Sequence, residues 1–388
     1  MSAPPYDQPL DTSLRQIRLL MILPKPHPID GRLQCHFTIG SLPKGCDELS
    51  YQALSYMWGE ADDFDFQIWL NDVLVPVRQN LLCALRVLRA DEDTIKLPIW
   101  IDALCIDQEN IEERGHQVDM MGVIYSSAER VIAWLRMPDI HELDELGLDT
   151  RRSHPERIPA AAFDFIQRSV FDLLWDSDSM IKHISAWTKD SPIDNSQERK
   201  SIQGVEELLS HDCWNRLWIL QEVYLAKRLL IFQGRSSIDW SHFSEMCQGI
   251  EDMIESSVVS TFKLPRLEFI MGSRPWWLNK IMRSNATVEP VKSEFSDLLK
   301  LSSNCRCTDR RDEIFGILGL ATDVDELDLS ADYSLSLFQL YVNNFVANEL
   351  QRREWGFDSL DLDFSDFFNW LFLARLCKIW IVRNEKRA

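Results

Sequence analysis

Strand-like and helix-like segments alternate between residues 51 and 135, and this alternation limits the fold more than any other feature of the chain. The run YQALSYMWG has the period-two pattern of a strand, and the run NLLCALRVLRA places Leu81, Leu85 and Leu88 on one helical face. A buried strand at LPIWI, a helix and a strand at RVIAWL follow. Strands that alternate with helices form α/β layers, so we expect a mainly parallel sheet flanked by helices.

Local signals predict the turns and helix starts within this region. The sequence FQIWLNDVLVPV holds two apolar runs around Asn71 and Asp72, which tolerate positive φ, and therefore predicts a hairpin. Asn80 is placed to cap the helix that it precedes, and Asn110 with Glu113 has the spacing of a capping box. The helix after Asn110 should bury one face, formed by Val118, Met121, Tyr125 and Ala128.

The remaining sequence surrounds this α/β region with less regular segments. Residues 1–48 are rich in proline and predict an extended lead-in that contains one strand, at 17–23. We expect the α/β domain to span 49–235, with a charge-rich insertion at 138–200 that holds one helix. Residues 236–388 predict a mostly helical C-terminal region. The pattern does not assign a role to 138–200 or to 350–388.

Charge and cysteine content exclude several classes of function. The net charge of −20 repels phosphate backbones, so we expect no nucleic-acid partner. The sequence shows neither a signal peptide nor an apolar run of the roughly 18 residues that a membrane span needs, and we expect a cytoplasmic protein. The nine cysteines should stay reduced, and the pair Cys305 and Cys307 lacks the second pair that a zinc site requires, so we expect no metal.

Polar residues follow the predicted strand LPIWI at once, as Asp102, Cys105, Asp107 and Gln108. Open α/β sheets bind ligands at the carboxyl ends of their strands, so this cluster is a candidate binding site for ribose or amide groups. Structural roles compete with this interpretation. Asp102 could cap the turn, Cys105 could fill a small space in the core, and Asp107 could cap the next helix. The structural role is favoured for Cys105 and Asp107, and both interpretations stay open for Asp102.

Five motifs occur in the order seen in one family. They are LSYMWG (54–59), WIDALCIDQ (100–108), ERGHQVDMMGVIYSSAERVIAWL (113–135), WNRLWILQEVYLA (214–226) and CTDRRDEIFGILGLA (307–321). In these motifs the chain resembles fungal heterokaryon incompatibility (HET) domain proteins, over residues 51–226 and more weakly to about 334. Asp107 stands where the family usually has Asn, and Arg136 where Gly often follows Trp-Leu. Many members are longer, which leaves open that this is a short or truncated form.

The resemblance implies a role in non-self recognition that ends in programmed cell death. HET domains are distantly similar to TIR domains, some of which cleave NAD between nicotinamide and ribose, so the resemblance implies a TIR-like fold and makes NAD a candidate substrate, with no cofactor required. It also implies self-association or other incompatibility proteins as partners. The alternative is a non-enzymatic signalling module that acts by self-association and recruitment.

Glu222 is the carboxylate that the TIR resemblance singles out, because LWILQEVYLA places Trp218 four residues before it. Trp218 and Ala226 share its helical face, and no Lys or Arg lies at the neighbouring face positions. Such a carboxylate must reach solvent, a distant arginine or a ligand, and it could stabilise a ribosyl cation as glycosidase carboxylates do. The competing interpretation is an ion pair with an arginine across the core.

Further candidate site residues come from the other motifs. Asp102 is the second candidate catalytic residue, and Gln108 and Trp218 are candidate binding residues. Tyr56 and Trp58 could stack on a base while Gly59 lets the backbone approach it, although an aromatic core with a turn glycine is the favoured explanation. We expect Glu222, Asp102 and Tyr56 or Trp58 to converge on one cleft. Arg114 is a candidate anchor for Asp102 or Glu222, and Arg310–Glu313 predict a structural lock onto the helical region.

Overall fold

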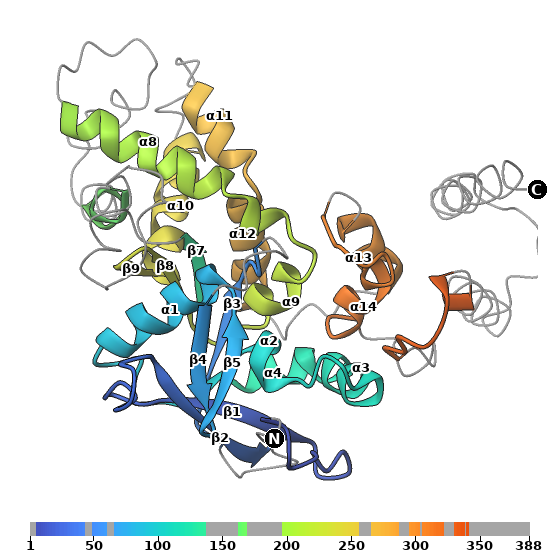
Figure 1. Cartoon of the computed structure of the whole chain (residues 1–388). Coiled ribbons are helices and arrows are strands. Elements are labelled where there is room, and N and C mark those ends of the chain that lie inside the picture. Colours follow the sequence, from blue (N-terminus) through green and yellow to red (C-terminus); the bar gives the residue numbers. More distant parts are fainter. Residues whose placement is uncertain are drawn as a thin grey trace, which may run out of the picture.

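Nine strands form one sheet within the part of the chain that the structure describes (Figure 1). This computed structural model describes residues 5–42, 49–59, 66–136, 162–168, 196–255, 265–286, 295–302, 305–321, 330–337 and 339–340. The order across the sheet is β5-β4-β2-β1-β6-β3-β7-β8-β9. The strands are β1 (Gln16–Ile22), β2 (Gln34–Ser41), β3 (Gln52–Tyr56), β4 (Phe66–Leu70), β5 (Val73–Val77), β6 (Ile99–Trp100), β7 (Arg130–Arg136), β8 (Leu229–Gln233) and β9 (Ser236–Asp239).

The expectation of a mainly parallel sheet is wrong, because the sheet is mixed. The pairs β2–β4, β3–β6, β3–β7 and β7–β8 are parallel, whereas β1–β2, β1–β6, β4–β5 and β8–β9 are antiparallel. Two residues join β4 to β5, and two join β8 to β9. Such short connections reverse the chain and cannot return it to start a parallel strand. The parallel centre is β6-β3-β7-β8, and hairpins extend it at both ends.

The predicted strand at 17–23 and the predicted hairpin are both confirmed. β1 pairs with β2 along its whole length and also meets β6, so residues of the lead-in belong to the central sheet. Asn71 and Asp72, the residues between β4 and β5, have φ of 49° and 61°. Positive φ at both positions is the geometry of the tight turn that fits the twist of a hairpin.

The described helices lie beside and beyond this sheet. They are α1 (Gln79–Ala90), α2 (Asp102–Cys105), α3 (Ile111–Asp119), α4 (Met121–Ser127), α8 (Ser196–Ser210), the 3₁₀ helix η2 (Asp212–Asn215), α9 (Ile219–Tyr224), α10 (Trp240–Glu255), α11 (Pro265–Met271), α12 (Arg274–Ala286), α13 (Phe295–Ser302) and α14 (Asp312–Leu318). Residues 162–168 are also helical. The rest of the helix expected within the insertion, and the region from 341 to 388, lie outside the described residues.

The amphipathic patterns bury the faces that the sequence predicts, but one predicted cap is wrong. Leu81, Leu85 and Leu88 are buried on α1. Asn80 lies inside α1, which begins at Gln79, and its side chain instead connects two strand ends. Its amide donates to the carbonyl of Met57 at 2.6 Å, and its side-chain oxygen accepts from the Trp134 indole at 2.8 Å. The Trp134 indole N–H is buried and requires a hydrogen-bond acceptor, and Asn80 supplies it.

The helix after Asn110 is divided into α3 and α4, with Met120 between them. Asn110 caps α3 as predicted, since its side chain accepts from the backbone N–H of Glu113 at 3.1 Å. The Glu113 carboxylate does not complete the box, because it pairs with the buried Arg18 of β1 at 2.5 Å. A long-range ion pair therefore replaces the local one and fixes α3 to the sheet.

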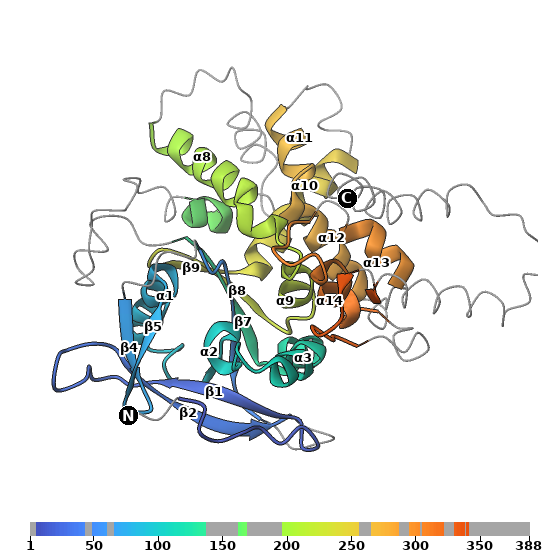
Figure 2. The ribbon, with the colours of Figure 1, turned by 45° about the vertical axis from the view of Figure 1, so that its right-hand side comes forward.

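Helix α9 lies between the sheet and α14. It contacts β3 and β7 on one side and α14 and α12 on another. Figures 1 and 2, two views 45° apart, both show α9 in this central position. The predicted helical character beyond residue 241 is confirmed by α10 to α14. The mixed sheet and the α9 layer together position the polar residues described next.

Candidate functional site

The first group of predicted site residues lies where β3 and β6 end. Tyr56 is the last residue of β3, Trp58 follows it, and Asp102 begins α2 directly after the short β6. Because β3 and β6 are parallel neighbours, these residues share one edge of the sheet. The carboxyl edge of parallel strands is the usual ligand side of an α/β sheet.

Asp102 is held by two donors, one from each of the two strand ends. Its Oδ2 accepts from the Trp58 indole at 2.9 Å, and its Oδ1 accepts from the backbone N–H of Ala103 at 2.7 Å. The second bond places the carboxyl at the start of α2, where negative charge is favourable. Asp102 therefore has a structural role as well, because it ends the strand and begins a helical turn.

The electrostatic surroundings of Asp102 set its protonation. Burial raises the pKa of the Asp102 carboxyl to about 6, and the negative charge of Glu222 adds to this rise. The Arg216 guanidinium and the two hydrogen bonds act in the opposite direction. A partly exposed carboxyl with this pKa can exchange a proton close to neutral pH, which is the requirement for general acid–base chemistry.

Glu222 lies on α9 as predicted, but its carboxylate is closed off from solvent. The side chain is 1% exposed, and Arg216 contacts both of its oxygens at 3.0 Å. The Ser55 hydroxyl of β3 donates to Oε2 at 2.5 Å. This is a bidentate guanidinium–carboxylate pair with one further donor, which is a strong and strongly directional arrangement.

One guanidinium thus serves two carboxyl groups. Burial by itself lowers the pKa of Arg216, but the facing negative charges, of which Glu222 is the largest, together outweigh burial and the net pKa lies above the ordinary value. Asp102 contributes to the same effect. The hydroxyl of Tyr56 faces the same charges, and burial raises its pKa well above 10. We call Ser55, Trp58, Asp102, Arg216 and Glu222 the polar centre.

The structure therefore brings Glu222, Asp102, Tyr56 and Trp58 into one region, but Glu222 does not face a cleft. Its partner is also not the one predicted. Arg114 was a candidate anchor for this carboxylate, and that prediction is wrong: its guanidinium lies 4.4 Å from the ring centre of Tyr333. The competing interpretation, an ion pair that neutralises Glu222, describes the geometry.

Sequence reasoning missed Arg216 and Ser55. Arg216 lies six residues before Glu222 and outside α9, so the helical spacing rule does not find it. The extended residue between η2 and α9 turns the chain and brings the guanidinium back to the carboxylate. Ser55 carried a usable signal, because it is the one serine within the fully buried strand QALSY, and a buried hydroxyl needs a partner.

The remaining predicted binding residues have other contacts. Gly59 has φ of +82° and no atom within 4 Å of an added Cβ, so glycine is needed there for the backbone angle and not for close approach. Gln108 donates to the backbone carbonyl of Asp102 at 2.9 Å and supports that turn. Trp218 turns away from the polar centre, and its indole donates to Asp312 at 3.2 Å.

Cys105 and Asp107 take structural roles. Cys105 is fully buried, and burial raises the pKa of its thiol to about 12, which keeps it protonated. Asp107 accepts from the backbone N–H of Glu109 at 3.2 Å and so shapes the loop before α3, whose cap is Asn110. No group of three or more His, Cys, Asp or Glu side chains within the described residues could hold a metal ion.

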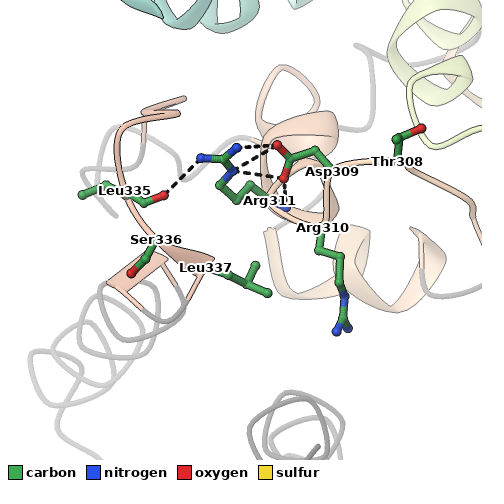
Figure 3. Close-up of a pocket in the computed structure, with 7 residues that line it drawn as sticks. All are labelled: Thr308, Asp309, Arg310, Arg311, Leu335, Ser336 and Leu337. Atoms are coloured by element: carbon green, nitrogen blue, oxygen red, sulfur yellow. Dashed lines mark hydrogen bonds and ion pairs between the residues drawn. The ribbon is translucent and has the colours of Figure 1, made fainter. Parts of the chain in front are cut away.

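An open hollow of about 530 Å³ lies elsewhere, on the segment that includes α14 (Figure 3). None of the predicted catalytic or binding residues lines it. Its charged residues are already paired, because Arg311 binds Asp309 and backbone carbonyls, and Arg310 lies 3.3 Å from Glu313. The lining residues are Thr308, Asp309, Arg310, Arg311, Leu335, Ser336 and Leu337.

Comparisons with known proteins bear on this geometry. The family model of the heterokaryon incompatibility protein (HET) matches residues 51–222. The protein "Heterokaryon incompatibility protein 6, OR allele" of Neurospora crassa is 26% identical over 372 aligned residues, which cover 87% of this chain and 52% of the relative. The chain thus spans about half the length of the curated relative that it matches. No solved structure matches the chain.

Every residue of the polar centre lies within the matched range, from Ser55 near its start to Glu222 at its end. In the described part of the chain, none of the helices has both the length and the apolar character to cross a bilayer. The matched range contains β3 to β7 and the first four residues of α9. Residues 51–222 therefore match the HET family, and we call this range the HET domain.

Proposed function

We propose that this chain acts in fungal non-self recognition, as the module that triggers cell death when incompatible cells fuse. The likeness to a heterokaryon incompatibility protein over 87% of the chain supports this role. The proposal extends the printed name of that relative to this chain, which covers about half of the relative. Its partners would be further copies of the chain or other incompatibility proteins.

The geometry of Glu222 favours signalling by assembly over catalysis by this residue. Both carboxylate oxygens are occupied by Arg216 and Ser55, and the side chain is 1% exposed. A group that stabilises a developing cation must reach the reacting atoms. In the proposed role, Glu222 instead ties α9 to β3 and keeps the module in one conformation.

NAD glycohydrolysis is a second candidate, and the observation in its favour is Asp102. This carboxyl is partly exposed, its pKa is raised to about 6, and it lies beside an indole and a guanidinium at the carboxyl edge of the parallel strands. In a TIR-like reaction, Asp102 would contact the ribose while Glu222 positions Arg216. NAD would be a substrate, and no cofactor would be required.

Cell death in a fungal host tests the first proposal. The full chain is produced in fungal hyphae, and the fraction of dead compartments is compared with that for Glu109→Gln, an exposed matched control, and for Asp102→Asn. We expect death with the natural chain and the control. Survival of hyphae that contain the folded, natural chain would contradict the proposed role.

Nicotinamide release separates the two mechanisms. The purified chain is incubated with NAD at concentrations that favour self-association, and the natural chain is compared with Asp102→Asn. Signalling without catalysis predicts no release, together with death that persists in Asp102→Asn. Release that Asp102→Asn abolishes, together with loss of death, would establish the enzymatic alternative.

A further inference from the structure

Residues 305–321 and 330–335 pack against the HET domain from outside the matched range, and we call them the clamp. The clamp begins with a backbone contact to the residue that neutralises Glu222. Arg306 forms a parallel bridge with Arg216. The Arg306 N–H donates to the carbonyl of Asn215 at 2.7 Å, and its carbonyl accepts from the N–H of Leu217 at 3.0 Å. These two bonds fix the backbone on both sides of Arg216.

A second contact fixes the start of α9. Asp312, the first residue of α14, accepts from the Trp218 indole at 3.2 Å and from the Tyr333 hydroxyl at 2.7 Å. The ring of Tyr333 also lies under the guanidinium of Arg114 on α3. One buried carboxylate therefore connects α14, α9 and the segment at 330–335.

The clamp also packs closely against α9, α4 and the end of α3. The amide of Gln221 donates to the carbonyl of Phe315 at 3.2 Å. A Cβ added at Gly319 would lie 2.8 Å from the Cα of Gly122, so α4 and the end of α14 meet backbone to backbone. The backbone N–H of Ala331 donates to Asp119 at the end of α3. The clamp thus contacts α9 and the α3–α4 segment.

We propose that the clamp is a positioning segment for the Arg216–Glu222 pair, and that the working unit of the HET domain extends beyond residue 222 to about 335. The reason is geometric. Arg216 lies in a short link between η2 and α9. Its own N–H donates to the carbonyl of Cys213 at the end of η2, but the groups on either side of it, the Asn215 carbonyl and the Leu217 N–H, are bound by Arg306. When the Arg306 bridge opens, the Arg216 guanidinium is free to leave Glu222, whose buried carboxylate then lacks a counter-charge.

A pair of substitutions at Arg306 isolates the bridge. The Arg306 side chain is 75% exposed, so Arg306→Ala removes only a weak surface ion pair with Asp212 and keeps the backbone bonds. Arg306→Pro removes the N–H that binds Asn215. Both are made in the full chain, and Arg306→Ala is the matched control.

Cys213 reports on the Arg216–Glu222 pair. Its thiol is fully buried, and it lies 4.0 Å from the Arg216 guanidinium. We expect Arg306→Pro to increase the rate of Cys213 alkylation at least tenfold, as measured by peptide mass spectrometry. It should also speed amide hydrogen exchange in residues 213–224. Exchange in β1 and β2 should not change, which separates local opening from unfolding. Arg306→Ala should behave like the natural chain.

Two outcomes would overturn the proposal. One is a folded Arg306→Pro chain whose Cys213 is as protected as before, and the other is equal opening in Arg306→Ala. If Arg306→Pro does not fold, Tyr333→Phe takes its place, because it removes the hydroxyl from Asp312 and keeps the ring. It should increase the exchange of α9 severalfold, and unchanged exchange would contradict the proposal. These readouts do not depend on cell death or on NAD.

Discussion

At the residue scale, the arrangement around Glu222 shows why a buried carboxylate needs a particular partner. The side chain is 1% exposed, and its two oxygens are bound by Arg216 and Ser55. Removing both charges from a buried pair is often tolerated, whereas removing one leaves an uncompensated charge. The ion pair is thus a constraint on which conformation α9 adopts more than a net source of stability.

Arg216→Met should lower the free energy of unfolding by about 3–5 kcal/mol, because it leaves Glu222 buried without a counter-charge. The double variant Arg216→Met/Glu222→Leu should recover most of the loss. Denaturant unfolding measures both. Arg228→Met is the control, since its pair with Asp239 is at the surface and is worth at most about 1 kcal/mol. A single variant no less stable than this control would contradict the assignment.

Asp102 predicts a pH dependence. Its pKa is raised from 3.8 to about 6 in the folded state, mainly by burial, so folding takes up protons between these values. The natural chain should therefore lose stability relative to Asp102→Asn as pH rises from 4 to 6, by up to about 3 kcal/mol at 1.36 kcal/mol per pKa unit. Unfolding curves at several pH values test this. Parallel pH profiles for the two proteins would exclude it.

At the element scale, short connections decide the sheet. The turn at Asn71 and Asp72, with both φ values positive, makes β4 and β5 an antiparallel pair. The loop of 23–33 does the same for β1 and β2. The sequence pattern of alternating strands and helices holds only for the centre, where longer crossovers allow β3, β6, β7 and β8 to run in parallel.

Asp72→Val should destabilise the chain by about 1–2 kcal/mol, because a β-branched residue cannot adopt φ of 61° without strain. Asp72→Gly should stay within about 0.5 kcal/mol of the natural chain, since glycine adopts this angle freely but loses more entropy on folding. Thermal unfolding of the two variants side by side measures the difference. Equal stability would mean that the turn does not require positive φ.

At the scale of the whole molecule, the HET domain and the region after it form one packed structure. Helix α9 contacts β3 and β7 on one side and α14 on another, and both views of the chain show this layering. The lock that the motif RRDE predicts is present in these contacts. A close backbone approach between two glycines also belongs to these contacts, and no charge pattern indicates it.

Gly319→Ala tests this approach. The new methyl group would lie 2.8 Å from the Cα of Gly122 and 2.6 Å from the side-chain oxygen of Gln221, so α4 and α14 must separate. We expect a loss of about 1–3 kcal/mol, the usual range for overpacking. Gly272→Ala, where the nearest atom lies at 3.1 Å, should lose less. Urea unfolding compares them, and the reverse order would contradict the packing described.

The sequence predicted the hairpin, the buried helical faces, the Asn110 cap and the strand-end position of Asp102, because each depends on residues close together in the chain. It predicted Glu222 as a central carboxylate without its partner. Arg216 is found only when the chain turns between η2 and α9, and Ser55 only when β3 lies under α9. Asn80 does not act as a cap, because its side-chain oxygen accepts a hydrogen bond from the indole of Trp134, 54 residues away in the chain.

Periodicity, turn residues and motif order thus determined by themselves that this is an α/β chain with the motifs of the HET family, since those properties depend only on residues close together in the sequence. Tertiary structure decided the rest: which strands run antiparallel, which guanidinium faces Glu222, and how far the folded unit extends. The physical reason is that charge neutralisation and close packing depend on distance in space. The two bonds of Arg306 to Asn215 and Leu217 join segments about 90 residues apart along the chain.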